Sequence, residues 1–157
     1  MEETLAAALA SRRAEVLTAC ACTNLRKAMR VATQRYDAAL RPCGLRATQL
    51  TLLLACADPE GTTIADVAAA LAVDRTTLSR TLRPLARKGL IDVERGPDRR
   101  ARHITITARG RETLVAALPL WAEAERRFAE TLGWDGMEQL LTALARVVAI
   151  REAQDTG

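Results

Sequence analysis

The feature that most constrains this chain is the stretch from Thr63 to Thr107, where two short helical patterns precede two strand-like patterns. Apolar residues first recur every three or four positions, which is the spacing of a helix with one buried face. The pattern then changes to alternation, as in strands with one buried face. Two helices joined by a tight turn and followed by a two-stranded ribbon are typical of a winged helix-turn-helix.

Local signals predict where these elements begin and end. The apolar stripe of the first helix consists of Ile64, Val67, Ala68 and Leu71. Asp74 can cap the second helix, because its carboxylate accepts hydrogen bonds from the free N–H groups of the first turn. Gly89 ends that helix at a position that favours a left-handed residue. The inward positions of the second helix are Leu78, Leu82 and Leu85. Strands are expected at 90–95 and 103–107.

Basic residues concentrate on the second helix and the ribbon. Residues 75–102 hold nine Lys or Arg and three Asp or Glu, an excess of six positive charges. The rest of the chain holds fourteen against sixteen, so the net charge of +4 arises from this module. A generic solvated surface would scatter both signs, whereas contact with phosphates requires a local excess of positive charge. The sequence therefore predicts a module whose partner is double-stranded DNA.

The residues expected to contact DNA lie at the start of the second helix and around the ribbon turn. In such modules the first turns of this helix enter the major groove, where arginine can bind guanine and hydroxyls can bind phosphate. Arginines at the ribbon tip can read the shape of the minor groove. The helix residues are Arg75, Thr76, Thr77, Ser79, Arg80 and Arg83. The ribbon residues are Arg95, Asp98, Arg99, Arg100 and Arg102. Lys88 is expected to contact phosphate or solvent.

Two segments of this module resemble the MarR (multiple antibiotic resistance regulator) family of bacterial transcription factors. They are T-x-L-S-R-x-L-x-x-L-x-x-K-G-L-I, from Thr76 to Ile91, and D-R-R-x-x-x-I-x-I-T, from Asp98 to Thr107. The resemblance implies that Asp98 and Arg100 brace the wing. It also implies a dimeric repressor bound to an operator that overlaps a promoter. Such a repressor leaves the DNA when a signal changes the spacing of its two recognition helices.

The remainder of the chain is expected to be helical. One helix is predicted from about Val16 to Leu40, with residues 2–13 forming a separate short helix or a frayed arm, and a second from Thr48 to about Ala57. Further along, Thr107 can cap a long helix that Gly133 ends. Asp135 can cap a last helix.

The predicted fold is mainly α with a small β-wing. A single MarR-like domain spans 1–157, with a winged helix-turn-helix DNA-binding lobe at 45–107 and dimerisation helices at 16–43 and 108–154. Apolar residues make up 49% of the chain but aromatics only 3%, so each side chain buries little area and a partner subunit should add stability. Two-fold pairing on a palindromic operator also supplies affinity that one recognition helix lacks, so a homodimer is expected. The alternative is a single compact helical core.

Several other classes of function are excluded or weakened. No run approaches the ~20 apolar residues of a membrane span and no leader opens the chain, so a cytoplasmic protein without a membrane partner is expected. His103 is the only histidine, so a histidine-based metal site or catalytic triad is excluded. No cofactor and no enzymatic activity are expected. A thiol peroxidase using Cys22 would lack an evident general base. A sequence-neutral architectural protein would bind random and promoter DNA equally.

The four cysteines are the main indication of the signal, and in a reducing compartment they are expected to be thiols. Cys20 lies about 200° around a regular helix from Cys22, so the Cys-x-Cys pair is a weak metal motif. One stripe of the first helix is expected to contain Cys22, Leu25, Met29, Ala32, Tyr36, Leu40 and Cys43.

The fourteen-residue spacing from Cys22 to Tyr36 resembles the organic hydroperoxide resistance regulators of the same family. In those proteins an early cysteine is oxidised and tyrosines of the partner subunit hydrogen-bond to it. The second tyrosine would fall near Ala47, which cannot donate a hydrogen bond. The resemblance implies oxidation at Cys22. No cysteine follows Cys56 to serve as a C-terminal resolving thiol, so Cys43 of the partner subunit is the candidate for that role.

Other signals remain open from the sequence. Thiolates of Cys20, Cys22 and Cys43 can capture a soft metal or metalloid. Alternatively, the cysteines are only small buried hydrophobic residues. The signal would then be a small aromatic or acidic compound in the cleft between the lobes, near Trp121 and Tyr36.

Overall fold

The computed structural model describes residues 2–58, 61–95 and 102–154. In chain order the elements are α1 (Glu2–Thr18), α2 (Ala21–Leu40), the 3-10 helix η1 (Arg41–Cys43), α3 (Ala47–Ala55), β1 (Thr62–Thr63), α4 (Ile64–Ala70), α5 (Arg75–Arg87), β2 (Ile91–Arg95), β3 (Arg102–Ile106), α6 (Ala108–Leu132) and α7 (Trp134–Gln154). The fold is mainly α with a small antiparallel sheet, which confirms the predicted fold class.

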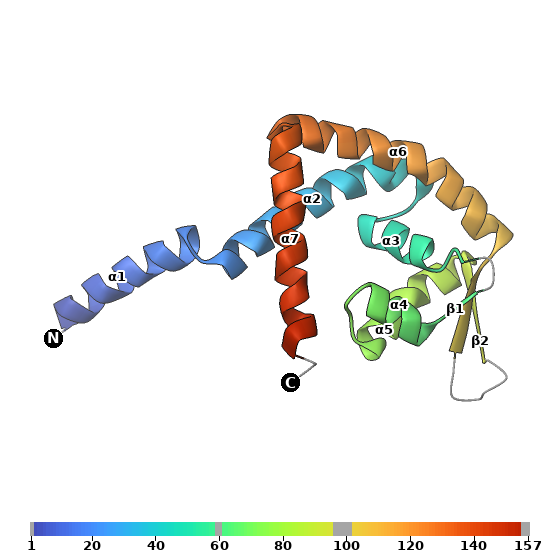
Figure 1. Cartoon of the computed structure of the whole chain (residues 1–157), viewed down its shortest axis with the longest axis horizontal. Coiled ribbons are helices and arrows are strands. Elements are labelled where there is room, and N and C mark those ends of the chain that lie inside the picture. Colours follow the sequence, from blue (N-terminus) through green and yellow to red (C-terminus); the bar gives the residue numbers. More distant parts are fainter. Residues whose placement is uncertain (1, 59–60, 96–101, 155–157) are drawn as a thin grey trace.

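The elements are arranged in two parts, as Figure 1 shows. Helices α3, α4 and α5 lie together with the sheet, below the start of α6. Above them α2 and α6 pack side by side, and α7 folds back from the end of α6. Helix α1 projects away from both parts, so the N-terminus lies at the far tip of the molecule.

The sheet has the strand order β1-β3-β2, with β3 paired antiparallel to both neighbours. In β3, Ile104 and Ile106 are buried, whereas Thr105 between them and Arg102 at the start of the strand are exposed. Strands β2 and β3 confirm the two predicted strands, and β3 shows the expected alternation. Strand β1 was not predicted, because its two residues are too few to show a period of two.

The core consists mainly of leucine. The three predicted inward positions of α5, Leu78, Leu82 and Leu85, are at most 2% exposed, as predicted. Leu40 from the end of α2 and Leu114 from α6 belong to the same buried cluster. The winged part is therefore packed directly onto the ends of both long helices.

Side chains and backbone close the helix ends as the sequence predicted. The Oδ1 atom of Asp74 accepts a hydrogen bond from the Thr77 N–H at 2.8 Å, which caps α5. The Thr107 hydroxyl accepts from the Gly110 N–H at 2.9 Å and donates to the Gly89 carbonyl at 2.7 Å. Thr107 thereby caps α6 and ties it to the end of α5, where Gly89 has the expected positive φ of 66°.

The prediction of one helix from Val16 to Leu40 was wrong. Helix α1 ends at Thr18, and a new helix begins at Ala21. Cys20 between them has the extended backbone of an N-cap, with φ −68° and ψ 118°. The carbonyls left free at the end of α1 accept hydrogen bonds from side chains of α2. The Asn24 amide donates to the Thr18 carbonyl at 2.8 Å, and Lys27 Nζ donates to the Leu17 carbonyl at 2.6 Å. These bonds stabilise a break that no proline or glycine marks.

The predicted cap of the last helix was also wrong. Helix α7 begins at Trp134, one residue before Asp135, and Gly133 turns the chain with a φ of 74°. The Met137 N–H donates to the Gly133 carbonyl at 3.0 Å, so Gly133 closes the first turn. Asp135 lies inside that turn, where a carboxylate still interacts favourably with the helix dipole.

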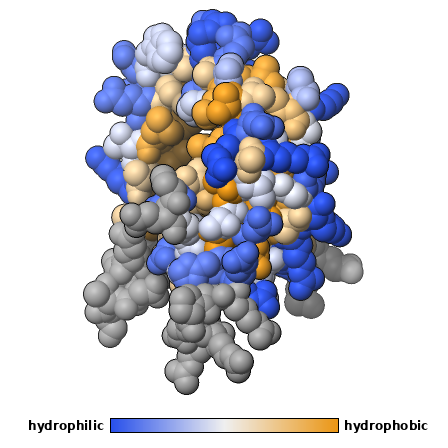
Figure 2. All heavy atoms as spheres, turned by 90° about the vertical axis from the view of Figure 1, so that its right-hand side faces the viewer, coloured by the Kyte–Doolittle hydropathy of each residue, from blue (hydrophilic) through white to orange (hydrophobic). Residues whose placement is uncertain are grey.

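Large apolar side chains remain exposed on α2, α6 and α7. Met29, Val115 and Trp134 are each about two-thirds exposed, at 65%, 69% and 68%. Figure 2 shows apolar side chains gathered in a hollow on one face, framed by hydrophilic ones. The single chain therefore leaves a substantial apolar surface uncovered. None of the helices in the described ranges combines the length and hydropathy needed to cross a bilayer.

Gly110→Ala is expected to destabilise the fold. A Cβ at Gly110 would lie 2.0 Å from the Leu90 carbonyl oxygen and 2.7 Å from Cγ1 of Ile106, so the backbone must shift. We expect a loss of roughly 1–3 kcal/mol in the free energy of unfolding, measured by urea titration. Gly136→Ala is the matched control, because its Cβ would meet only Cβ of Leu132, at 3.7 Å. That variant should gain about 0.5–1 kcal/mol. Equal midpoints for the two variants would contradict this packing.

Candidate nucleic-acid interface

The predicted recognition residues lie outside the buried stripe of α5. Its leucines at 78, 82 and 85 face the core. Helical geometry places Thr76, Arg80 and Arg83 on the opposite side, with Thr77 on one flank and Arg75 and Ser79 on the other. Within this set, Arg75, Thr76, Arg80 and Arg83 are exposed, whereas Thr77 and Ser79 are half-buried. Helix α5 therefore presents three arginines and a hydroxyl on one accessible surface.

The turn between α4 and α5 determines how α5 is presented. Ala72 has a φ of 52°, in the left-handed region that normally favours glycine. The Val73 N–H donates to the Ala68 carbonyl at 3.0 Å, which closes this turn. Hydrogen bonds from Thr77, first from its side chain and then from its backbone, hold the pKa of Asp74 below its usual value. The start of α5 is thus capped by a carboxylate that stays ionised.

Lys88 makes contacts that sequence reasoning did not find. Its Nζ donates to the Gly44 carbonyl at 2.7 Å and to Oε1 of Gln49 at 3.2 Å. Lys88 therefore links the end of α5 to the segment that leads into α3, while the residue remains exposed. No local sequence signal predicts this contact, because Gly44 lies 44 residues earlier.

The ribbon carries the second group of predicted residues. Arg95 and Arg102 are paired in register, at the end of the described ribbon, and Arg102 is exposed. The side chain of Arg95 lies outside the described residues. Asp98, Arg99 and Arg100 lie outside them as well, so the predicted brace between Asp98 and Arg100 stays a prediction. His103 is half-buried in β3, opposite Glu94.

A cavity of about 690 Å³ lies between α2, α6 and α7. Its lining residues are Cys22, Leu25, Arg26, Ala28, Met29, Ala32, Tyr36, Glu125, Phe128, Met137, Leu140, Leu141 and Leu144. The predicted stripe is therefore confirmed from Cys22 to Tyr36. Leu40 continues it into the buried core, and Cys43 is half-buried against that core.

Tyr36 links α2 to α6 inside this cavity. Its hydroxyl donates a hydrogen bond to Oε2 of Glu125, and its ring lies 6.0 Å from that of Phe128 between centroids. Burial, followed by the hydrogen bond and the charge of Glu125, raises the pKa of Tyr36. The hydroxyl therefore remains a donor at physiological pH. Sequence reasoning found Tyr36 but missed Glu125, its partner on α6.

The four cysteines are free thiols in different surroundings. Cys22 is exposed, whereas Cys56 is buried and burial raises its pKa to about 11, which makes it a poor nucleophile. Hydrogen bonds from Thr23, first from its backbone, hold the pKa of Cys20 below its usual value. Because Cys20 precedes α2, the predicted angle of about 200° between it and Cys22 was wrong. Within the described residues, no three His, Cys, Asp or Glu side chains are grouped to hold a metal ion.

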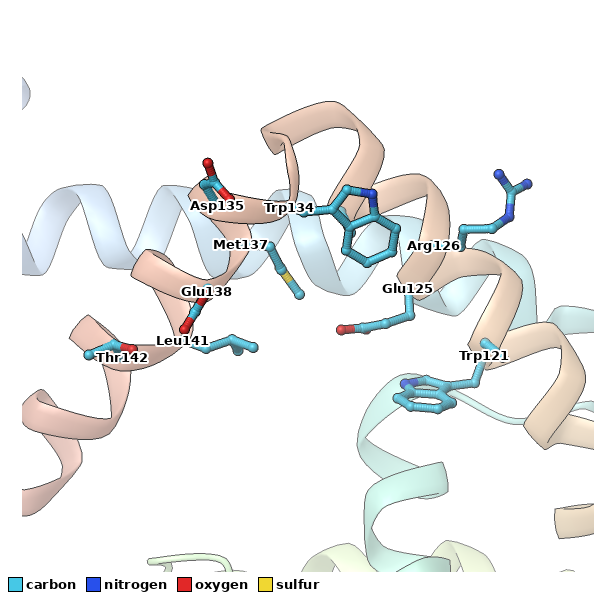
Figure 3. A pocket seen from close by; sticks show the side chains of 11 residues that line it. Trp121, Glu125, Arg126, Trp134, Asp135, Met137, Glu138, Leu141 and Thr142 are labelled. Carbon is cyan, nitrogen blue, oxygen red and sulfur yellow. The ribbon is translucent and has the colours of Figure 1, made fainter.

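A second depression, a groove of about 640 Å³, lies between α6 and α7 (Figure 3). Trp121 lines this groove and not the cavity that contains Tyr36, which corrects the expectation that both face one cleft. Glu125 lines both depressions.

Comparison with known proteins gives consistent matches. The sequence model of the MarR family matches residues 44–101. The transcriptional regulator MosR of M. tuberculosis, solved with DNA, is 37% identical, with 85% of this chain and 97% of that chain covered and a TM-score of 0.77. The transcriptional repressor CouR, solved with a 23-mer DNA duplex, is 29% identical, with 84% and 94% covered and a TM-score of 0.75. A second CouR structure contains p-coumaroyl-CoA; it is 27% identical, with the same coverage and TM-score. No curated protein sequence matches the chain.

Proposed function

Because this chain belongs to the MarR family of transcriptional regulators, we propose that it is a dimeric repressor that a chemical signal releases from a palindromic operator. As a member of this family, the protein is a DNA-binding transcription regulator and not an enzyme. The observation that carries the proposal is the exposed polar side of α5, held in place by buried leucines and followed by a ribbon with arginines at its end. We propose that the protein acts in the cytoplasm, where the operator DNA lies.

The proposed DNA contacts divide between base reading and phosphate binding. Arg75, Thr76, Thr77, Ser79 and Arg80 lie at the start of α5, which would enter the major groove. Arg83 lies one turn further and would contact phosphate. The wing residues Arg95, Asp98, Arg99, Arg100 and Arg102 would act at the minor groove, with Asp98 as a brace. Positive charge on both elements supports this division.

The dimer would be built from the helices at 16–43 and 108–154, outside the winged lobe at 45–107. Their exposed apolar side chains support this proposal, since burying such surface stabilises association. A two-fold dimer also places two copies of α5 on one palindrome.

We propose thiol oxidation at Cys22 as the signal. Cys22 is exposed yet lines an apolar cavity, so oxidant can reach it while a sulfenic acid formed there would lie against apolar side chains. A disulfide with Cys43 of the partner subunit, or a soft metal held by both thiolates and by Cys20, would act at the same helices. Either change would alter the spacing of the two DNA-binding lobes.

A small organic ligand is the second candidate signal. The cavity of about 690 Å³ has the size of a ligand site, and the similarity to CouR, which has been solved with p-coumaroyl-CoA, favours this alternative. In that case the cysteines would be structural.

Arg80→Ala is expected to weaken operator binding by about 1–3 kcal/mol, because a bidentate contact to guanine would be lost. The measurement is fluorescence anisotropy at fixed salt, with operator DNA from beside its own gene and random DNA in parallel. Arg12→Ala removes the same charge from α1, where the side chain is 78% exposed, and should leave affinity unchanged. If Arg80→Ala binds the operator as tightly as the parent, the recognition helix has been assigned incorrectly.

Sedimentation at micromolar concentration should give twice the chain mass of 17.0 kDa. Val147→Asp places a charge on the exposed apolar side of α7 and should shift the protein toward monomer. Val93→Asp changes an exposed valine on the wing strand and should remain dimeric. A monomeric parent that still binds a palindrome tightly would refute the dimer.

An organic peroxide should release the parent protein from its operator, whereas Cys22→Ser should stay bound. The oxidised thiol becomes a polar group beside the apolar side chains that line the cavity. Cys43→Ser tests the resolving thiol, arsenite tests soft-metal capture, and Cys56→Ala serves as the control for a buried thiol. A full response of Cys22→Ser to every agent would leave the organic ligand as the better proposal.

A further inference from the structure

The C-terminal end of α5 is held by hydrogen bonds from two sides. On one side, Nζ of Lys88 donates to the Gly44 carbonyl at 2.7 Å and to Oε1 of Gln49 at 3.2 Å. On the other side, the Gly89 carbonyl accepts from the hydroxyl of Thr107, the residue that caps α6, at 2.7 Å. The end of the recognition helix is therefore bonded both to the segment around the start of α3 and to the start of α6.

The segment that receives Lys88 is itself held in place. Oε1 of Gln49, the oxygen that accepts from Lys88, also accepts from the Arg46 N–H at 3.2 Å. At the first residue of α3, the Ala47 N–H donates to Oδ1 of Asp37 at 2.7 Å, and Asp37 belongs to α2. A continuous set of hydrogen bonds therefore connects α2, the start of α3 and the end of α5.

These bonds add a constraint that the leucine core supplies less well, namely the angle of α5. Burial of apolar surface is non-directional, whereas a hydrogen bond weakens steeply as its geometry departs from linear. Helix α5 has 13 residues and is therefore about 20 Å long. A tilt of about 5° at its C-terminal end would move its first turn by about 2 Å. A hydrogen bond from that turn to a base edge would not survive such a displacement.

We propose that Lys88 is a positioning residue for DNA binding, which sets the angle of α5 in the major groove through its bonds to Gly44 and Gln49. Lys88 lies 13 residues after Arg75, about 20 Å along the helix from the end that would enter the groove. Its ammonium group already donates to two oxygens of the protein. The inference rests on the function proposed above, in which α5 reads the operator.

Two other roles of Lys88 make different predictions. A lysine that contacts phosphate adds to the salt dependence of binding, so its removal would reduce the slope of log affinity against log salt concentration by about 1. A lysine that only interacts with the dipole at the end of α5 would act independently of Gln49. A positioning residue depends on its acceptor, leaves the salt slope unchanged and affects operator DNA more than random DNA.

The first test compares single variants by fluorescence anisotropy, with operator and random DNA over a range of salt concentrations. Lys88→Met keeps the aliphatic stem but removes the donor, so operator affinity should fall about three- to tenfold, as for one lost hydrogen-bonded link. The ratio of operator to random affinity should fall with it, at an unchanged salt slope. Lys88→Arg can donate to both oxygens and should restore the ratio. Arg87→Met removes the same charge from the neighbouring exposed position and should keep the ratio of the parent.

The second test changes the acceptor. Gln49→Glu keeps an oxygen for Lys88 and should preserve the ratio, whereas Gln49→Ala should lower it. The double variant of Lys88→Met with Gln49→Ala should lose no more than the larger single loss, because both changes break one link. Additive losses, a salt slope reduced by about 1 in Lys88→Met, or a full operator preference in that variant would each overturn the proposal.

Urea unfolding of the same four proteins, without DNA, separates this inference from the proposed function. Non-additive changes in the free energy of unfolding show that Lys88 and Gln49 are linked, and additive ones refute the link. If the parent binds operator and random DNA equally, the proposed function fails, while the unfolding measurements still decide the link. If the parent prefers the operator and Lys88→Met does so equally, the positioning role fails and the regulator remains.

Discussion

The structure depends on one buried leucine cluster that joins three elements with different tasks. Leu78 faces inward from α5, Leu40 ends α2, and Leu114 lies in the second turn of α6, and all three belong to the same buried cluster. Protein interiors are close-packed, so a shift of one of these helices must move the others. The polar side of α5 is therefore coupled mechanically to the long helices, and not merely attached to them by the chain.

Most of the fold could be predicted because its signals are local. The leucine spacing of α5, the caps at Asp74 and Thr107 and the turn at Gly89 each involve residues a few positions apart. The break between α1 and α2 could not be predicted, since Lys27 reaches back ten residues to close it. Where a side chain from the next helix replaces a glycine or a proline, the sequence carries no signal of a helix end.

The same limit applies to the functional sites. The outer residues of α5 follow from the inner ones, because a helix that buries one stripe must expose the opposite one. Periodicity likewise placed Cys22 and Tyr36 on one side of α2. It could not supply Glu125, which is 89 residues from Tyr36, nor the placement of Trp121 and Trp134 along one groove. Contacts between distant helices depend on packing that only the folded chain determines.

The frame of α2, α6 and α7 holds two depressions that share one contact. Cys22 lines one side of the region and the two indoles line the other, while Glu125 faces both and is held by Tyr36. A change at either place reaches the DNA-binding lobe only through α2 or α6, since these helices enter the leucine core. A half-buried hydrogen bond between two such helices is a suitable point of control, because removing its acceptor leaves a hydroxyl that has lost its partner in a largely apolar cavity. The placement of one carboxylate therefore connects both depressions to the helices that enter the leucine core.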